Sequence, residues 1–383
     1  MDCLKNHYSG SNNQSLGRTL RLVLQNGRMT KPDMAAQLGV SLPTVSQNVR
    51  LLMDDGLLAH DGTAVSTGGR KAQTVVPMPN ARLALGLDVT AHQVQGVLLD
   101  LQGTDLDAFS QSLPFSNSET YFHQLGEIAE VFLQSHGVRQ PQLLGTGISI
   151  PGVLSPDGQM LTRSHVLRVE RLSASSFSDH LPGLCTLCND AKAAAVAELW
   201  DRRELGSAVY LSLSNSVGGA IVLNNQIYDG LHRHGGEFGH MTLIPDGRRC
   251  YCGQYGCMDA YCSAGILTES TGSLEHFFQL LGNGNASCAR LWHRYAEHLA
   301  LAIHNILTIL DCPVILGGYV GARLTDQLLQ ELISRIEERA TFEVPEGAVL
   351  QCSYRRSAAA VGAALLPIRS FLGSPAFPLP PEI

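Results

Sequence analysis

The 383-residue sequence predicts an α/β protein with a small helical domain at its N-terminus. Three observations lead to this prediction. Two short helices meet at a glycine turn near residue 39, strands and helices alternate from residue 83 onward, and a histidine and three cysteines with metal-ligand spacing lie between residues 236 and 259. Alternating strands and helices are typical of α/β layers. We expect three domains, over residues 1–80, 81–188 and 189–383.

Three helices are expected within the first domain, at residues 16–26, 30–38 and 41–52. Thr30 and Ser41 are suited to begin the second and third helices, because their hydroxyls can accept hydrogen bonds from backbone N–H groups. Gly39 lies between these two helices, as the turn of a helix-turn-helix motif requires. The third helix then presents an outer polar face that can read base edges in a major groove: Thr44, Ser46, Gln47 and Arg50.

A β-hairpin, or wing, is predicted to follow, with strands at 56–60 and 71–76. Arg70 and Lys71 lie at its glycine-rich tip, where they can reach phosphates or a narrow minor groove. Residues 1–80 carry eight Lys or Arg against five Asp or Glu, whereas the rest of the chain carries 19 against 29. A basic head on an acidic body favours DNA as the partner. The alternative is a helical domain used for dimerisation or protein contact.

The later α/β region is predicted from periodicity and turn residues. Strands are expected at 83–89, 94–101, 145–150, 209–214, 220–223 and 314–316, and helices at 119–135, 289–310, 325–339 and 358–367. The apolar run LCTLC at 184–188 predicts a further, buried strand. No apolar run is long enough to span a membrane, and the first residues lack the apolar centre of a signal peptide. Ten cysteines without a disulfide framework fit a reducing compartment, so we expect a cytoplasmic protein.

Four residues have the spacing of a metal site: His240, Cys250, Cys252 and Cys257. Thiolate and imidazole are the ligands that Zn²⁺ prefers, and three sulfurs with one nitrogen complete a closed structural site. Glycines inside the Cys252–Cys257 loop suit a backbone that folds tightly around an ion. The sequence therefore predicts one structural zinc ion per chain; the alternative is a set of unrelated core cysteines and a surface histidine.

The run G-E-x-G-H ending at His240, followed by C-x-C-G-x-x-G-C-x-[ED], resembles the signature of the ROK family, which groups sugar-responsive repressors with sugar kinases. The likeness extends from about residue 83 to residue 367. The T-V-S, G-L and G-G-R motifs beginning at Thr44, Gly56 and Gly68 resemble the winged helix of its repressor branch, of the N-acetylglucosamine and xylose repressor type. The resemblance implies a two-lobed fold of the actin and hexokinase type, with a sugar in the cleft and the C-terminal helix packed on the first lobe.

The resemblance also implies which residues hold the sugar. Asn189 and Asp190 match the family's Asn-Asp pair, and Glu237, His240 and Asp259 match its other sugar contacts. Carboxylates accept hydrogen bonds from neighbouring hydroxyls and so read their stereochemistry. His240 would serve twice, with one ring nitrogen on the metal and the other facing the sugar. Asp259 stands where glutamate is usual.

Both phosphate loops of the kinases are degenerate here. The family's D-x-G-G-T is D-V-T-A-H at residues 88–92, and its G-T-G-x-G is S-N-S-V-G at residues 214–218. Phosphoryl transfer depends on positioning the phosphates, so we do not expect an enzyme. We expect a repressor that binds operator DNA and a sugar or sugar phosphate, as a homodimer or homotetramer. The alternatives are a sugar kinase with an accessory DNA-binding domain and a non-sensing scaffold for another protein, such as a sugar-transport component.

Overall fold

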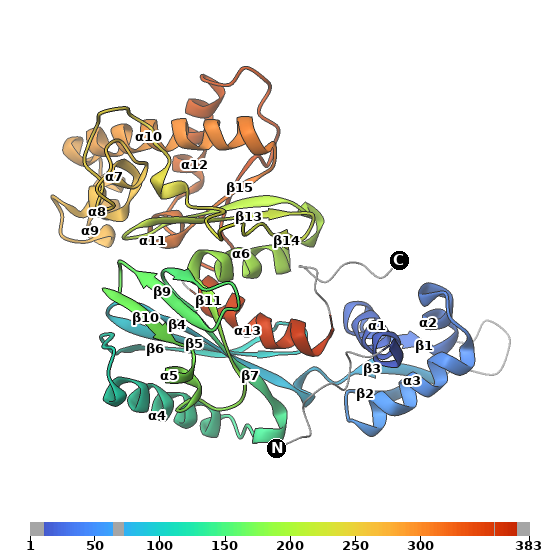
Figure 1. Ribbon diagram of the computed structural model, residues 1–383. Coiled ribbons are helices and arrows are strands. Elements are labelled where there is room, and N and C mark those ends of the chain that lie inside the picture. Colours follow the sequence, from blue (N-terminus) through green and yellow to red (C-terminus); the bar gives the residue numbers. More distant parts are fainter. Residues whose placement is uncertain (1–10, 64–72, 356, 374–383) are drawn as a thin grey trace. The chain divides into compact units, whose positions relative to one another are not determined.

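The computed structural model describes residues 11–63, 73–355 and 357–373, and the chain forms two compact units. The first unit comprises residues 1–150, 154–188 and 360–383, and the second comprises residues 151–153 and 189–359. The second unit is therefore almost continuous in sequence. The first unit is completed by a C-terminal helix, which follows the second unit in the sequence. Figure 1 colours each element by its place in the sequence.

The N-terminal region is a winged helix-turn-helix. Its elements are α1 (Ser11–Asn26), β1 (Met29–Thr30), α2 (Lys31–Leu38), α3 (Leu42–Asp54), β2 (Leu58–Thr63) and β3 (Gln73–Pro77), with the strands in the antiparallel order β1-β3-β2. The predicted caps are present: Thr30 Oγ1 accepts from Asp33 N at 3.4 Å, and Ser41 Oγ accepts from Thr44 N at 3.3 Å. Gly39 ends α2 with φ 64°, a left-handed conformation that favours glycine.

The first unit continues in a five-stranded mixed sheet of order β11-β7-β4-β5-β6. Its strands are β4 (Leu83–Val89), β5 (Gln93–Asp100), β6 (Asp105–Ser112), β7 (Leu143–Ile150) and β11 (Cys185–Asn189). Smaller elements are η1 (Pro79–Ala81), η2 (Gln140–Gln142), the sheet of β8 (Val153–Leu154), β9 (Met160–Ser164) and β10 (Val169–Ser173), and α5 (Ser175–Ser178). Helix α4 (Glu119–Ser135) packs its apolar side on Leu85 and Leu87 of β4.

Helix α13 (Ala358–Phe371) covers the opposite face of this sheet (Figure 1). A Cβ atom added at Gly86 would lie 2.0 Å from Ala360 O, and one added at Gly147 would lie 1.9 Å from Ala363 O. Because both distances are far below contact, only glycine is compatible with so close an approach of helix and strand backbone. The sheet therefore holds α13 directly against its main chain.

The end of α13 contacts the winged helix-turn-helix region. Buried Arg21 of α1 donates from Nη1 to Leu372 O at 2.5 Å. A Cβ atom at Gly17 would lie 3.0 Å from the same carbonyl oxygen. Gln102 Nε2 adds a second hydrogen bond to α1, at Leu24 O and 2.9 Å. Helix α1 is thus joined to the sheet domain at two places.

The second unit contains a five-stranded sheet of order β14-β13-β12-β15-β16. Its strands are β12 (Ala208–Leu213), β13 (Val217–Leu223), β14 (Gln226–Ile227), β15 (Val314–Gly317) and β16 (Val349–Gln351). Its helices are α6 (Asp190–Asp201), η3 (Arg203–Leu205), η4 (Phe238–His240), α7 (Asp259–Cys262), α8 (Ala264–Thr268), α9 (Leu274–Gly282), α10 (Ala286–Leu310), α11 (Gly318–Gly321) and α12 (Asp326–Glu337).

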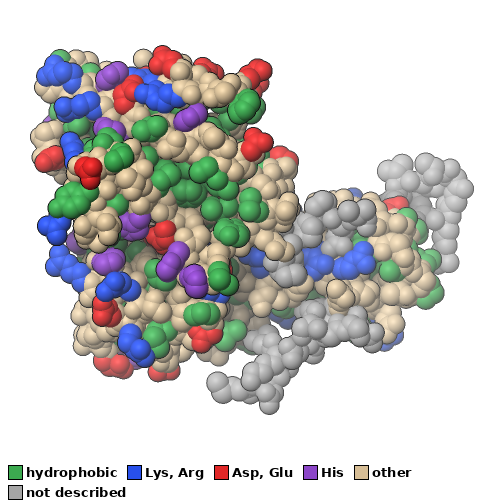
Figure 2. Space-filling view, turned by 45° about the horizontal axis from the view of Figure 1, so that its top comes forward, with side chains coloured by type: hydrophobic (Ala, Val, Ile, Leu, Met, Phe, Trp, Pro, Cys, Tyr) green, Lys and Arg blue, Asp and Glu red, His purple; other side chains and the backbone are tan. Residues whose placement is uncertain are grey.

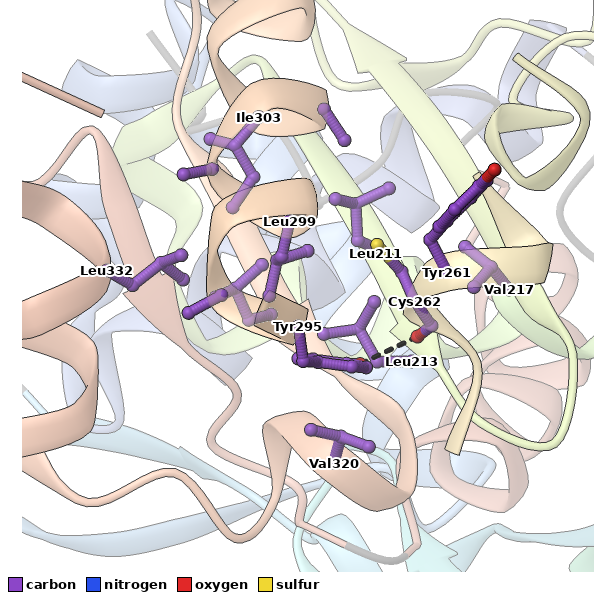
Figure 3. Packing of buried hydrophobic residues seen from close by; sticks show 14 of the residues in the cluster. Leu211, Leu213, Val217, Tyr261, Cys262, Tyr295, Leu299, Ile303, Val320 and Leu332 are labelled. Carbon is purple, nitrogen blue, oxygen red and sulfur yellow. Dashed lines mark hydrogen bonds between the residues drawn. The ribbon is translucent and has the colours of Figure 1, made fainter. Parts of the chain in front are cut away.

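The core of the second unit lies between β12, α10 and α12. Figure 3 shows Leu211 and Leu213 of β12 facing Leu299 and Ile303 of α10. The buried Tyr295 hydroxyl donates to Cys262 O at 2.6 Å. A buried polar group is tolerated when it is hydrogen-bonded. This bond therefore ties the long helix α10 to α7, which follows the loop of Cys250, Cys252 and Cys257.

The predicted strands and helices of both α/β regions are present, with ends shifted by a few residues. The run at 184–188 is a strand, but the expectation that it is buried was wrong. Strand β11 is the edge of its sheet, only Leu187 within it is buried, and Leu184 is 75% exposed. No helix of the described ranges is long and apolar enough to cross a membrane. On the face drawn in Figure 2, acidic and basic side chains are interspersed.

Candidate functional site

Helix α3 presents the outer face that the sequence predicted. Val45, Val49 and Leu52 are fully buried on its inner side. Gln47 and Arg50 are exposed, and the Arg50 side chain, 84% accessible, has its Nε 4.0 Å from Asp54 Oδ2. Thr44 and Ser46 are half-buried, and Thr44 Oγ1 lies 2.8 Å from Ser41 Oγ at the helix cap. Arg70 and Lys71, predicted for the wing tip, lie outside the described residues.

His240, Cys250, Cys252 and Cys257 form one cluster, with all four ligand atoms within 4.8 Å of one another. Cys252 Sγ and Cys257 Sγ are 3.8 Å apart, and Cys250 Sγ is 4.0 Å from His240 Nδ1. Two sulfurs of a tetrahedral zinc site with Zn–S distances near 2.3 Å are about 3.8 Å apart. The cluster therefore fits a metal ion of that size.

Glycine shapes the loop that holds these cysteines. Gly253 and Gly256 have φ values of 95° and 81°, which other residues rarely adopt. A Cβ atom at Gly256 would also lie 1.8 Å from Ile244 O. The loop is closed by isolated β-bridges, of which one joins Thr242 to Cys257. The backbone of this segment thus turns so that Cys257 lies beside the residues that follow His240.

Asn189 and Asp190 stand at the junction of β11 and α6. Asn189 caps α6, since its Oδ1 accepts from Lys192 N at 3.0 Å, while its Nδ2 donates to Gly152 O at 3.1 Å. Burial, and to a smaller extent the negative charge of Glu237, raise the pKa of Asp190, while hydrogen bonds from backbone N–H groups and from Asn189 lower it. Asp190 and Glu237 are therefore close enough to interact, and Asn189 fixes the start of α6, where Asp190 stands.

Asp259 is 7% exposed and braces the turn between β12 and β13. Its Oδ1 accepts from Val217 N at 2.6 Å and from Ser216 Oγ at 3.0 Å. Burial raises the pKa of Asp259, and these two hydrogen bonds and the charge of His240 lower it. One oxygen of this carboxylate is therefore engaged inside the protein. It ties α7 to the turn between β12 and β13.

Sequence reasoning missed Tyr251, which lies between two of the cysteines. Its hydroxyl is 3.3 Å from His240 Nε2 and 3.1 Å from Ser216 Oγ. Burial raises the pKa of Tyr251 to about 12, with contributions from the negative charges of nearby groups that include Asp259 and Glu237. The available signal was its position: a residue between Cys250 and Cys252 cannot lie far from His240.

Side chains and close backbone contacts fill the turn between β12 and β13, at residues 214–216. Ser214 Oγ accepts from Tyr319 N at 3.4 Å, and Ala264 N donates to Ser214 O at 2.8 Å. Gly318 has φ 72°, and a Cβ atom there would lie 2.6 Å from Leu213 N, so the neighbouring backbone requires this glycine. In the first unit, Thr90 Oγ1 donates to Gln93 O at 2.8 Å across the turn between β4 and β5.

Residues 84–370 match the ROK family, and residues 13–59 match a winged helix-turn-helix DNA-binding domain. The chain belongs to the ROK family. It is 24% identical over 364 residues to the xylose repressor of Bacillus subtilis, covering 92% of this chain and 94% of that protein. It is 30% identical over 296 residues to the N-acetylmannosamine kinase of Shigella boydii, covering 74% and 97%.

Among solved structures, a ROK family transcriptional regulator described as a homolog of the E. coli MLC protein matches with a TM-score of 0.77 and 20% identity. The match covers 94% of this chain and 97% of that one. The kinase relative lacks a counterpart for about a quarter of this chain, whereas the regulator spans nearly all of it. The fold is therefore a winged helix-turn-helix followed by the ROK family's actin and hexokinase-like α/β fold, as the sequence predicted.

Proposed function

We propose that this ROK-family protein is a sugar-responsive transcriptional repressor. The observation that supports it most directly is the combination, in one chain, of exposed polar residues on α3 and, in the second unit, of Asp190 interacting with Glu237 and of His240 beside three cysteines. The xylose repressor, named for such a function, is similar over nearly the whole length. A DNA-binding regulator acts where the DNA is, so we assign the protein to the cytoplasm.

The operator is read by α3 and the wing. Gln47 and Arg50 are free of the packed core and can reach base edges or phosphates, while Thr44 and Ser46 stand nearer the helix start, beside the backbone of the DNA. Arg70 and Lys71 supply cations at the wing tip. The Arg50 pair with Asp54 is solvent-exposed and weak, so DNA phosphates can replace it.

The effector is a sugar or sugar phosphate held by the second unit. Asp190 and Glu237 accept hydrogen bonds from neighbouring hydroxyls, and His240 supplies a ring N–H. Asn189 acts mainly by fixing the start of α6, where both ends of its amide are occupied. Asp259 contributes through its second oxygen, because Oδ1 is engaged by Ser216 and Val217.

The metal is Zn²⁺, held by His240, Cys250, Cys252 and Cys257. Three sulfurs and one nitrogen fill its four positions, so the ion is structural and supplies no open coordination site. It fixes the loop from residue 250 to residue 257 and the orientation of the His240 ring. A bound effector thus meets an imidazole whose position is set before binding.

The protein is not a kinase. Bare glycine turns are needed to let phosphates approach backbone N–H groups. Here Thr90 and Ser216 stand in those turns, and the Ser216 hydroxyl donates to Asp259. Asp190 keeps the position of a general base, but phosphoryl transfer requires the phosphates to be held as well.

Effector binding reaches DNA through α13 and through a symmetric homodimer or homotetramer. Helix α13 begins where the chain passes from the second unit to the first, and the carbonyl of Leu372 just beyond it accepts from Arg21 of α1. A sugar-transport protein is a further partner under the scaffold alternative.

The test is an operator-release assay with the full-length protein. Promoter DNA is footprinted with a panel of monosaccharides and their phosphates. We expect one sugar to release DNA from wild type, whereas Glu237→Ala binds the same DNA and no longer responds. Release of Glu237→Ala at the wild-type sugar concentration would refute the assigned site. ADP formation with that sugar at an ordinary enzymatic rate would favour the kinase instead.

A further inference from the structure

Each ring nitrogen of His240 has a different neighbour. Nδ1 faces Cys250 Sγ at 4.0 Å, within the metal cluster. Nε2 faces the Tyr251 hydroxyl at 3.3 Å. The rings of His240 and Tyr251 meet edge to face, with centroids 5.4 Å apart and an interplanar angle of 66°. The nitrogen that is not directed at the metal cluster is therefore already in contact with a side chain of this chain.

The hydrogen bonds run in one direction from His240 to a carboxylate. Ser216 Oγ donates to Asp259 Oδ1 at 3.0 Å, so its own lone pairs accept from the Tyr251 hydroxyl at 3.1 Å. Because its own hydrogen points to Ser216, the Tyr251 hydroxyl oxygen can accept a hydrogen bond from His240 Nε2–H. A metal ion on Nδ1 leaves the ring proton on Nε2, which is the tautomer that this sequence of bonds requires.

We propose that Tyr251 is a specificity-determining residue that competes with the effector for His240. Its hydroxyl occupies the Nε2–H from which a sugar hydroxyl would accept. The inference rests on the proposed function, in which His240 contacts the sugar. A sugar that contacts His240 must break the hydrogen bond between His240 Nε2 and the Tyr251 hydroxyl. Only a sugar with a hydroxyl placed to accept from Nε2–H replaces that bond, and other sugars do not.

The exposure of Tyr251 makes this exchange feasible. The residue is 52% exposed, and it stands on a loop whose backbone is fixed by the neighbouring cysteines and glycines. Its ring can therefore turn away from His240 without disturbing the core. Asp259 keeps its hydrogen bonds from Ser216 Oγ and Val217 N when the tyrosine leaves, so no buried carboxylate is left unpaired.

The experiment measures sugar binding by full-length variants through thermal stabilisation. The probes are D-glucose, D-xylose, N-acetyl-D-glucosamine and N-acetyl-D-glucosamine 6-phosphate. Tyr251→Phe removes the competing hydroxyl and keeps the ring, so we expect binding to tighten about three- to tenfold, the worth of one net hydrogen bond. Tyr255→Phe is the matched control: Tyr255 lies in the same loop, is 55% exposed and should bind sugar as wild type does. Metal content should be equal in all variants.

A second readout needs no sugar. In protein carrying ¹⁵N-labelled histidine, the His240 Nε2 proton should exchange with water faster in Tyr251→Phe than in wild type. Equal exchange overturns the inference.

Unchanged or weaker sugar binding by Tyr251→Phe overturns it as well, while loss of binding in Glu237→Ala would leave the proposed function standing. If Glu237→Ala binds sugar as wild type does, or if no probe binds any variant, the assigned sugar site fails and the inference fails with it.

Discussion

Arg21→Met tests whether the contact between α1 and the end of α13 transmits the effector signal. Arg21 is buried and donates to Leu372 O at 2.5 Å, and methionine keeps most of its apolar length while removing the charge and the donor. A hydrogen bond from a charged group contributes about 1.5–3 kcal/mol. The Arg21 guanidinium also lies at the C-terminal end of α13, where cations are stabilising, so we use this range for its hydrogen bond to Leu372 O.

This free energy limits how much coupling the contact can carry. A loss of about 1.5–3 kcal/mol corresponds to roughly 10- to 150-fold in an equilibrium constant. We therefore expect the sugar-induced change in operator affinity to shrink in Arg21→Met by about tenfold and by no more than about 150-fold, with the sugar affinity of the second unit unchanged. The assay is fluorescence anisotropy of labelled operator DNA with and without the sugar identified by thermal shift.

Arg21→Lys is the graded control, because a lysine keeps the charge and one donor but loses the guanidinium geometry. It should fall between wild type and Arg21→Met. A circular dichroism melt of each variant separates coupling from misfolding. If folded Arg21→Met releases DNA with the wild-type sugar response, the contact does not transmit the signal and the reasoning is refuted.

Three further predictions follow from described contacts. Cys252→Ser should lose the bound metal and several degrees of melting temperature, whereas Cys312→Ser, outside the cluster, should keep both; metal analysis that finds equal zinc in the two would exclude the site. Arg50→Ala should weaken operator binding without changing the melting temperature, and equal affinity in a titration would remove α3 from the interface. Glu198→Ala should destabilise the protein by about 3–5 kcal/mol in urea unfolding, because this fully buried carboxylate pairs with Arg202 and accepts from two backbone N–H groups; a loss below 1 kcal/mol would contradict that role.

Local signals in the sequence predicted the helices of the DNA-binding region well. Thr30, Ser41 and Gly39 act through their own neighbours, so their spacing alone predicted both ends of α2 and the start of α3. Strand β6 (Asp105–Ser112) was not predicted, because none of its side chains is buried and its pairing with β5 is made by backbone groups. A strand without an apolar face has no period to detect.

The candidate site likewise contains residues that local signals predicted and residues that they did not. The cluster of one histidine and three cysteines was predicted because four such ligand residues at short spacing allow few other arrangements. The role of Asp259 could not be predicted, since its partners Ser216 and Val217 lie more than forty residues away and are chosen by the packing of α7 against the β12–β13 turn. Tyr251 was overlooked for a related reason: a tyrosine between two cysteines signals nothing about which atom its hydroxyl will reach.

The position of α13 in the chain has a consequence for biosynthesis. The ribosome completes all of the second unit before it adds residues 360–373, yet these residues cover the first unit's sheet at Gly86 and Gly147 and supply the carbonyl that receives Arg21. Domains fold as their segments become available during synthesis. A nascent chain therefore completes the loop of Cys250, Cys252 and Cys257 before α1 is docked, and a product truncated before α13 would keep the second unit while leaving the first unit's sheet uncovered.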